Sequence, residues 1–138
     1  MMIREFQAGS GRHQPSVLIG HDAGTEDMWA SRLRERLGPV GVEVRDASTS
    51  REVLRVIEMG LVHVALLADA PRLDGLAALR MIRSIDSTLP CVLITAGPDR
   101  RWLERALALR ADSVFSPPID LELMCRLVTR LLRSRGGS

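Results

Sequence analysis

The stretch HVALLADAPRLDGL, residues 63–76, decides the fold, because it changes from a strand pattern to a helix pattern. The apolar run through Leu66 and Leu67 predicts a buried strand, while Pro71 and Asp74 predict a loop that leads into a helix. In α/β proteins, reactive groups gather where buried strands end at the carboxyl edge of a parallel sheet. Here the strand ends on leucine, and the nearest carboxylate, Asp69, follows two residues later.

Short apolar runs like this one recur along the chain, separated by segments of helical period. They predict five buried parallel strands, at residues 16–19, 42–44, 62–67, 91–95 and 113–115. Between them, apolar residues repeat at three- and four-residue spacing, as in Trp29, Leu33 and Leu37. The alternation predicts an α/β fold, a doubly wound five-stranded parallel sheet with helices on both faces.

Local signals mark the helix ends. Thr49 and Glu52 form the pattern of a capping box, and Gly38 and Gly60 are placed to close the helices before them. The last helix is expected at residues 120–135, with Asp120 as its N-cap and a wide apolar stripe.

Length and composition fit one globular domain. The chain has 138 residues, 46% hydrophobic and 26% charged, and no apolar run approaches the roughly 20 residues of a membrane span. The amino-terminal residues lack the apolar core of a secretory signal, so we expect a cytoplasmic protein without membrane attachment. The two cysteines, Cys91 and Cys125, lie in apolar segments and are expected to be unpaired core residues.

The kind of cation excludes several chemistries. All 19 basic residues are arginine, no tyrosine occurs, and the formal net charge is +2. This chain therefore has no lysine to form a Schiff base and no lysine or tyrosine to act as a general acid. Arginine cannot replace them, because a guanidinium keeps its proton. The small net charge gives no electrostatic argument for nucleic acid.

Four landmarks together resemble the receiver domain of bacterial response regulators, which is CheY-like. They are Asp22 after the first strand, PRLDGL at residues 71–76, LITA at 93–96 and ADSVFSPPID at 111–120. The resemblance implies a flavodoxin-like fold over residues 16–133, flanked by a flexible arm at 1–15 and a flexible tail at 134–138. It also implies a cis peptide bond between Pro117 and Pro118.

The family's pocket holds an acidic pair, a phosphoacceptor aspartate, a hydroxyl and a lysine. These positions fall here on His21, Asp22, Leu67, Thr95 and Pro117. A leucine cannot carry a phosphoryl group, and an imidazole in the acidic pair weakens a magnesium site, because that ion prefers oxygen ligands. We therefore expect a degenerate receiver that is not an enzyme, has no cofactor or metal, and works independently of phosphorylation.

Two other interpretations stay open. Asp69 could act as the phosphoacceptor with Mg²⁺ if the loop were shorter than the family's, although Pro71 and Asp74 align without a gap. Alternatively, the altered pocket could sense a small ligand in an apolar cleft lined by Leu67, Thr95 and Pro117.

Partners are expected at the surface that the family builds from its fourth helix, fifth strand and fifth helix. That surface would include Trp102, Arg105, Leu109, Arg126 and Arg130. It would bind a protein partner or form a homodimer. Nucleic acid is not expected, because a solvated helix face explains the arginines and few aromatic residues are available for stacking.

Overall fold

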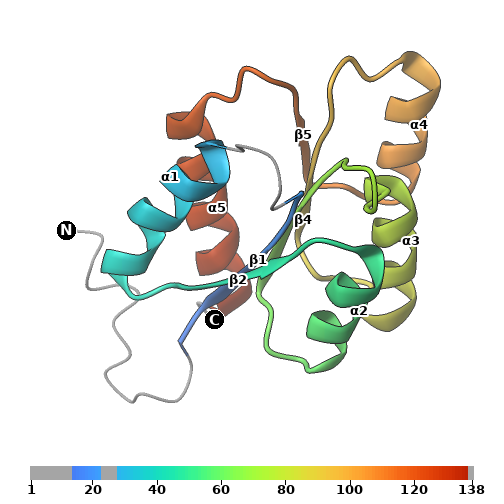
Figure 1. The fold of residues 1–138 in the computed structure, drawn as a ribbon. Coiled ribbons are helices and arrows are strands. Elements are labelled where there is room, and N and C mark those ends of the chain that lie inside the picture. The colour runs from blue at the N-terminus through green and yellow to red at the C-terminus, as the bar shows by residue number, and fades with distance from the viewer. Residues whose placement is uncertain (1–13, 23–27, 137–138) are drawn as a thin grey trace.

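The computed structural model describes residues 14–22 and 28–136, so most of the predicted arm and the last two residues of the predicted tail lie outside the described residues. Five parallel strands form one sheet, with β1 at Ser16–Gly20, β2 at Glu43–Ala47, β3 at Val64–Ala68, β4 at Cys91–Ile94 and β5 at Ser113–Phe115. Their spatial order is β2-β1-β3-β4-β5 (Figure 1). The predicted flavodoxin-like α/β fold is confirmed.

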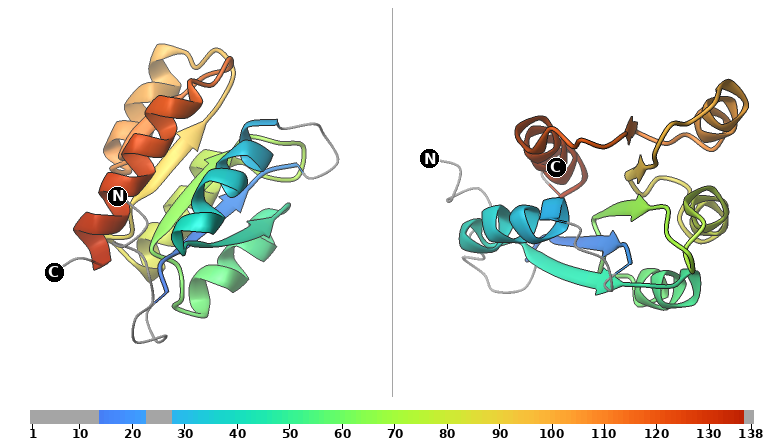
Figure 2. Two further views of the ribbon diagram at one scale, coloured as in Figure 1. Left: turned by 90° about the vertical axis from the view of Figure 1, so that its left-hand side faces the viewer. Right: turned by 45° about the horizontal axis from the view of Figure 1, so that its top comes forward.

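Five helices cover the sheet, with α1 at Met28–Leu37, α2 at Ser50–Glu58, α3 at Gly75–Ile85, α4 at Arg100–Ala108 and α5 at Leu121–Gly136. Helices α1 and α5 lie on one face and α2, α3 and α4 on the other (Figure 2). Two apolar clusters form the core, one on each face, because strand side chains alternate between the two sides. Val64 and Leu66 belong to the first cluster, and Ala65 and Leu67 to the second.

The predicted capping signals are largely confirmed. The Glu52 amide donates to Thr49 Oγ1 over 3.1 Å, and the Leu123 amide donates to Asp120 Oδ1 over 3.0 Å. Gly60 has a φ of +74°, as a helix-closing glycine requires. The peptide bond between Pro117 and Pro118 is cis, as predicted.

Two local predictions were wrong. Gly38 does not close α1, because the chain continues there into a 3-10 turn at Gly38–Val40, and Gly41 takes the left-handed conformation instead. Strand β2 is not buried on both faces, since only Ala47 in it is buried. It is an edge strand, and an edge strand can keep polar residues such as Arg45 and Asp46.

Arg83 connects three segments near the amino-terminal edge of the sheet: helix α3, the residues before β4 and the end of α4. Its guanidinium donates to the carbonyl oxygens of Leu89 over 2.7 Å and of Leu109 and Arg110 over 3.0 Å each. One side chain on α3 thereby holds the entry to β4 and the end of α4.

Cys91 begins β4 inside the core. Its side chain is fully buried, and the same burial raises the pKa of the thiol to about 12. Its backbone amide donates to Asp112 Oδ2 over 2.8 Å. Cys91 and Cys125 are both unpaired, as expected.

Candidate functional site

The candidate site lies where β1, β3 and β4 end at the carboxyl edge of the sheet, and its centre is apolar. Leu67 is fully buried and is paired in register with Gly20 of β1. A Cβ on Gly20 would lie 3.0 Å from Leu73 Cδ2 and 3.3 Å from both Leu67 Cδ2 and Val53 Cγ2. The missing side chain of Gly20 therefore makes the space that these three side chains fill. We call Leu67, Leu73 and Val53 the apolar plug.

Asp69 lies beside this plug and already has two donors. Its Oδ1 accepts from the amide of Gly75 at the start of α3, and its Oδ2 accepts from the Thr95 hydroxyl, each over 2.7 Å. A Cβ on Gly75 would lie 3.0 Å from Asp69 Oδ1, so a larger residue there would crowd the carboxylate. A carboxylate at a helix N-terminus is also favoured by the helix dipole. Asp69 thus joins the loop after β3 to the start of α3 and the end of β4.

Sequence reasoning placed Asp69 in a loop but missed this bridge. The signal was present, because Asp69 comes six residues before Gly75 and the following strand ends at a hydroxyl residue. What the sequence did not show was the turn between them, in which Ala70 and Leu73 exchange backbone hydrogen bonds of 2.9 and 3.0 Å. That turn brings Asp69 back toward the helix.

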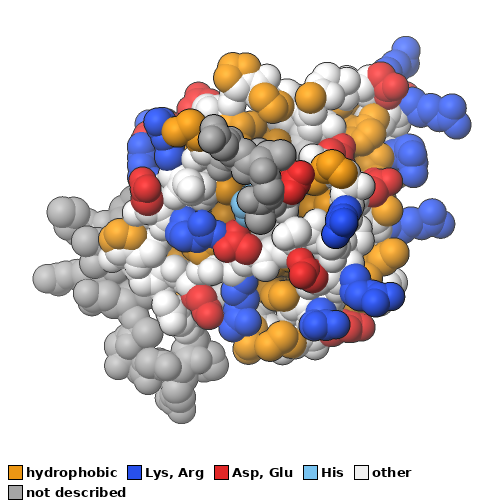
Figure 3. Space-filling view, viewed as in Figure 1, with side chains coloured by type: hydrophobic (Ala, Val, Ile, Leu, Met, Phe, Trp, Pro, Cys, Tyr) orange, Lys and Arg blue, Asp and Glu red, His pale blue; other side chains and the backbone are white. Residues whose placement is uncertain are grey.

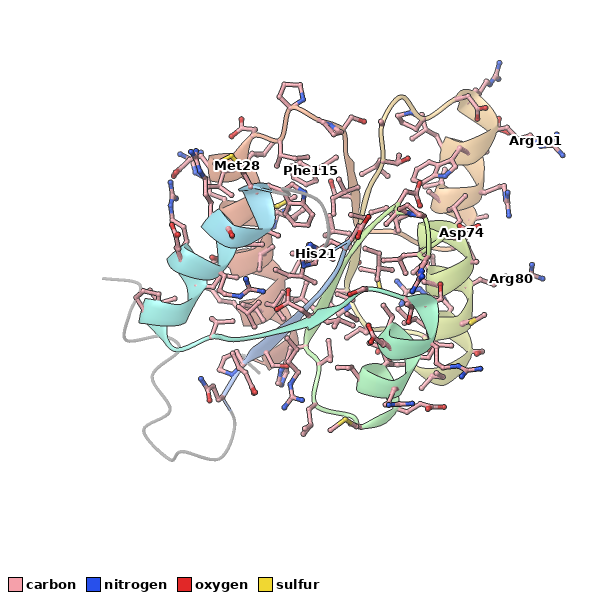
Figure 4. The ribbon with its side chains drawn as sticks, in the orientation of Figure 1. His21, Met28, Asp74, Arg80, Arg101 and Phe115 are labelled. Carbon is pink, nitrogen blue, oxygen red and sulfur yellow. The ribbon has the colours of Figure 1, made fainter. Side chains whose placement is uncertain are left out.

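His21 belongs to a different polar group, on the α1 side of the sheet (Figure 4). Its Nε2 lies 2.9 Å from Asp46 Oδ1 on β2, and Arg34 of α1 pairs with the other oxygen of Asp46. The ring meets Trp29 edge to face at a centroid distance of 6.2 Å. His21 is thus a buried member of a His–Asp–Arg group, directly after the end of β1.

The residues at this edge do not fit a magnesium ion well. The resemblance places the acidic pair at His21 and Asp22, but the His21 ring supplies nitrogen and is directed to Asp46. The Asp69 carboxylate is engaged with the donors from Gly75 and Thr95. Within residues 14–22 and 28–136, no three or more His, Cys, Asp and Glu side chains are grouped to hold a metal.

The other two pocket positions lie at the ends of β4 and β5. Thr95 follows β4, and its amide donates to the Phe115 carbonyl over 3.0 Å. Pro117 is exposed and begins the cis peptide bond. Proline has no side-chain charge, so it cannot replace a lysine beside an anion.

The structure separates the five residues predicted for the interface. Arg126 and Arg130 of α5 line a hollow of about 290 Å³ with β5, while Trp102 and Arg105 line another hollow on α4. Leu109 packs against the core cluster on the α4 side of the sheet. Two exposed leucines of α4, Leu103 and Leu107, were not among the residues predicted for the interface.

Fold and site together define a doubly wound α/β domain with polar groups at the carboxyl edge of its sheet. The chain belongs to the response regulator receiver domain family, whose model matches residues 24–129. It is a receiver domain of two-component signalling. Receiver domains interact with other proteins and are generally not catalytic. Within the described part of the chain, no helix has the length and apolar character needed to cross a membrane.

Solved structures show the same fold. A CheY-like receiver domain from Methanospirillum hungatei superposes with a TM-score of 0.77 at 19% identity, covering 89% of this chain and 97% of that one. A two-component response regulator from Clostridium difficile gives 0.76 at 24% identity, covering 91% and 100%.

A curated relative is the sensor histidine kinase RcsC of Salmonella typhimurium, 28% identical over 93 residues. The match covers 67% of this chain but only 10% of the kinase. This chain therefore resembles one small part of that much longer protein.

Proposed function

We propose that this receiver domain acts as a phosphorylation-independent protein-interaction module. The observation that carries the proposal is the apolar plug. Leu67, at the position that the resemblance gives to the phosphoacceptor, is fully buried against leucine and valine. No carboxylate is available there to form an acyl phosphate, and the chain has no lysine to stabilise one.

Asp69 supports the proposal from a second side. A phosphoryl group on either of its oxygens would displace the bond from the Gly75 amide or the bond from the Thr95 hydroxyl. Modification would therefore disrupt the start of α3 or the end of β4 before any new contact formed. Output in this proposal comes from contacts with another protein, in the cytoplasm, where unpaired cysteines are usual.

The test is a titration of the full chain with beryllofluoride and magnesium, followed by amide NMR. Beryllofluoride mimics a phosphoryl group on an accessible aspartate, so we expect no saturable shift and no change in oligomeric state. The matched control is Asp69→Asn under the same conditions. A saturable shift in the wild type that disappears in Asp69→Asn would show that Asp69 is the acceptor and would overturn the proposal.

The small-ligand interpretation has less support. The space beside Gly20, which an apolar ligand would need, is filled by the apolar plug.

A further inference from the structure

Helix α3 carries exposed apolar residues beside helix α2. Met81 is 43% exposed and Ile85 is 45% exposed. They are four residues apart, so they lie on the same flank of α3. Helices α2 and α3 lie side by side on one face of the sheet and contact each other (Figure 1). Exposed apolar side chains that gather in this way mark a site of protein contact.

Arg83 shows which flank of α3 carries Met81 and Ile85. It directly follows the buried Ile82, and its guanidinium donates to the carbonyl of Leu109, which ends α4. The flank that follows Ile82 therefore faces α4. Met81 precedes Ile82, so Met81 and Ile85 lie on the opposite flank, toward α2.

Helix α2 presents a matching flank toward α3. It runs in the same direction as α3, because both helices connect parallel strands, and α2, α3 and α4 follow one another across this face of the sheet (Figure 2). The residues that follow the buried Val53 and Ile57 therefore face α3, and they are the half-buried Leu54 and the exposed Glu58. Arg51 is also exposed, and it lies on the same side of α2 because it precedes Glu58 by seven residues, or two turns.

The charges on this flank of α2 have no partner within the described part of the chain. Neither Arg51 nor Glu58 forms an ion pair with any described residue. The other charged residues of α2 are placed differently, since Glu52 accepts from the Ser48 amide on the opposite flank and Arg55 lies opposite the core. Along its length, the flank thus carries a cation, a leucine and an anion.

We propose that this surface binds a second copy of the chain, with α2 of one copy antiparallel to α2 of the other. We call Arg51, Leu54, Glu58, Met81 and Ile85 the α2–α3 face. A twofold axis near Leu54 would bring Glu58 of each copy opposite Arg51 of the other, so the order of charges along α2 is self-complementary. The inference rests on the proposed function, which it deepens by naming the partner and the surface.

The chemistry of the face suits such a contact. Leu54 would meet its counterpart near the axis, while Met81 and Ile85 would be buried beside it. Methionine is unbranched and adapts its shape to a facing surface. The guanidinium of Arg51 can bind a carboxylate in a planar, two-bond geometry.

Other occupants fit the α2–α3 face less well. A wholly acidic segment would place carboxylates opposite Glu58, and a wholly basic segment would place cations opposite Arg51. Like charges brought together at an interface cost binding free energy. Nucleic acid also fits poorly, because its phosphates would be repelled by Glu58 and would leave Met81 and Ile85 without an apolar contact.

The experiment measures self-association of the full chain by sedimentation, up to the concentrations used for NMR. We expect a reversible dimer, with amide NMR signals of α2 and α3 that shift as the concentration rises. Arg51→Glu and Glu58→Arg should each weaken the dimer at least about tenfold, because each variant brings like charges together across the axis. A wild-type protein that stays monomeric throughout would overturn the proposal.

Mixing the two variants tests the pairing itself. In a mixture of Arg51→Glu and Glu58→Arg, both contacts across the axis regain opposite charges, so we expect a heterodimer although each variant alone associates weakly. The matched control is Arg101→Glu on α4, which makes the same change of charge and should leave self-association unchanged. Circular dichroism and thermal denaturation show whether each variant is folded. Folded variants that fail to associate when mixed would refute the arrangement.

A second pair of variants locates the contact. Met81→Glu should abolish the dimer, whereas Leu107→Glu, at an exposed leucine of α4, should leave it intact. The reverse result would move the contact to another surface and overturn the proposal.

Repeating the sedimentation with beryllofluoride and magnesium keeps the two proposals distinct. A dimer that forms only in their presence and is lost with Met81→Glu would refute phosphorylation independence but keep the α2–α3 face. No dimer under either condition would refute the face alone.

Discussion

The charged groups at the carboxyl edge of the sheet are paired, whereas those beside β5 are not paired with any described residue. We call the α5 residues that line the hollow beside β5, which are Leu123, Leu127, Arg126 and Arg130, the β5 face. At the carboxyl edge, Asp69 has two hydrogen-bond donors and Asp46 has both His21 and Arg34. At the β5 face, Arg126 and Arg130 have no ion-pair partner among the described residues. Groups that are satisfied within the fold stabilise it, whereas groups left without acceptors are available for a partner.

The arginines of the domain also differ in their surroundings. Arg83 bonds to several carbonyls within the fold, whereas Arg101 projects from α4 and Arg80 from α3 (Figure 4). In the space-filling view, a series of basic side chains lies along the α3 and α4 side of the molecule, at the right of the picture (Figure 3). The residue type alone does not distinguish an arginine that stabilises the fold from one that projects into solvent. Substitutions can distinguish them.

The largest effect is expected from Leu67→Asp, which would put a charge into the apolar plug. The carboxylate would be buried among apolar side chains such as Val53 and Leu73, in a chain without lysine, so the free energy of unfolding should fall by about 1 to 4 kcal/mol at neutral pH. Urea denaturation measures the change.

The pH dependence of that variant gives its control. Burial raises the pKa of a carboxyl group, so the loss should shrink as the pH falls below the folded-state pKa, where the group is neutral. Leu67→Asn should show a loss without this pH dependence. A Leu67→Asp variant as stable as the wild type at neutral pH would mean that the edge still tolerates a charge.

Arg83→Gln should have the next largest effect. A glutamine cannot reach the carbonyls of Leu89, Leu109 and Arg110 together, so about 1.5 to 3 kcal/mol of stability should be lost. Hydrogen exchange should accelerate at the start of β4 and the end of α4. No change in either quantity would show that the carbonyls are equally well solvated by water.

Asp69→Asn tests the bridge at the carboxyl edge. The amide oxygen can still accept from Gly75, but the amide nitrogen cannot accept from the Thr95 hydroxyl, so we expect a loss of about 1 kcal/mol. Thr95→Val removes the same bond from the other side. In a double-mutant cycle, the two losses should therefore not add, and full additivity would contradict the bridge.

The smallest effect is expected at the β5 face. Arg126→Gln and Arg130→Gln should each change stability by less than about 0.5 kcal/mol, because neither guanidinium has an ion-pair partner in the described fold. Thermal denaturation of these variants and of Arg83→Gln under the same conditions compares the losses of stability. A loss as large as that of Arg83→Gln would remove the contrast between the two regions.

The sequence predicted the fold because every level of the pattern agreed. Apolar runs, helical spacing and caps such as Thr49 and Asp120 all indicated the same alternation of strands and helices. The landmarks around Pro71 and Pro117 then located the carboxyl edge. Prediction was poorer for β2, because an edge strand lacks the continuous apolar pattern of a buried one.

The contacts of the candidate site were not predicted from the sequence. The leucine at position 67 can be read directly from the sequence, yet the apolar plug also depends on Gly20 and Val53, which come from other elements. Likewise, the His21–Asp46 contact joins the residue after β1 to strand β2, 25 positions away in the sequence. At the β5 face, four-residue spacing pairs Leu123 with Leu127, but only the structure shows that both line a hollow beside β5.

The burial of Cys91 provides an internal probe of how often the domain opens. The Cys91 thiol is fully buried, and this burial raises its pKa, so it cannot react with an alkylating reagent until the strand around it opens. Because β4 lies between β3 and β5, that opening requires the sheet to come apart. The rate at which Cys91 is modified would therefore report how often the whole domain opens, while the half-buried Cys125 on α5 would report local fraying in the same sample.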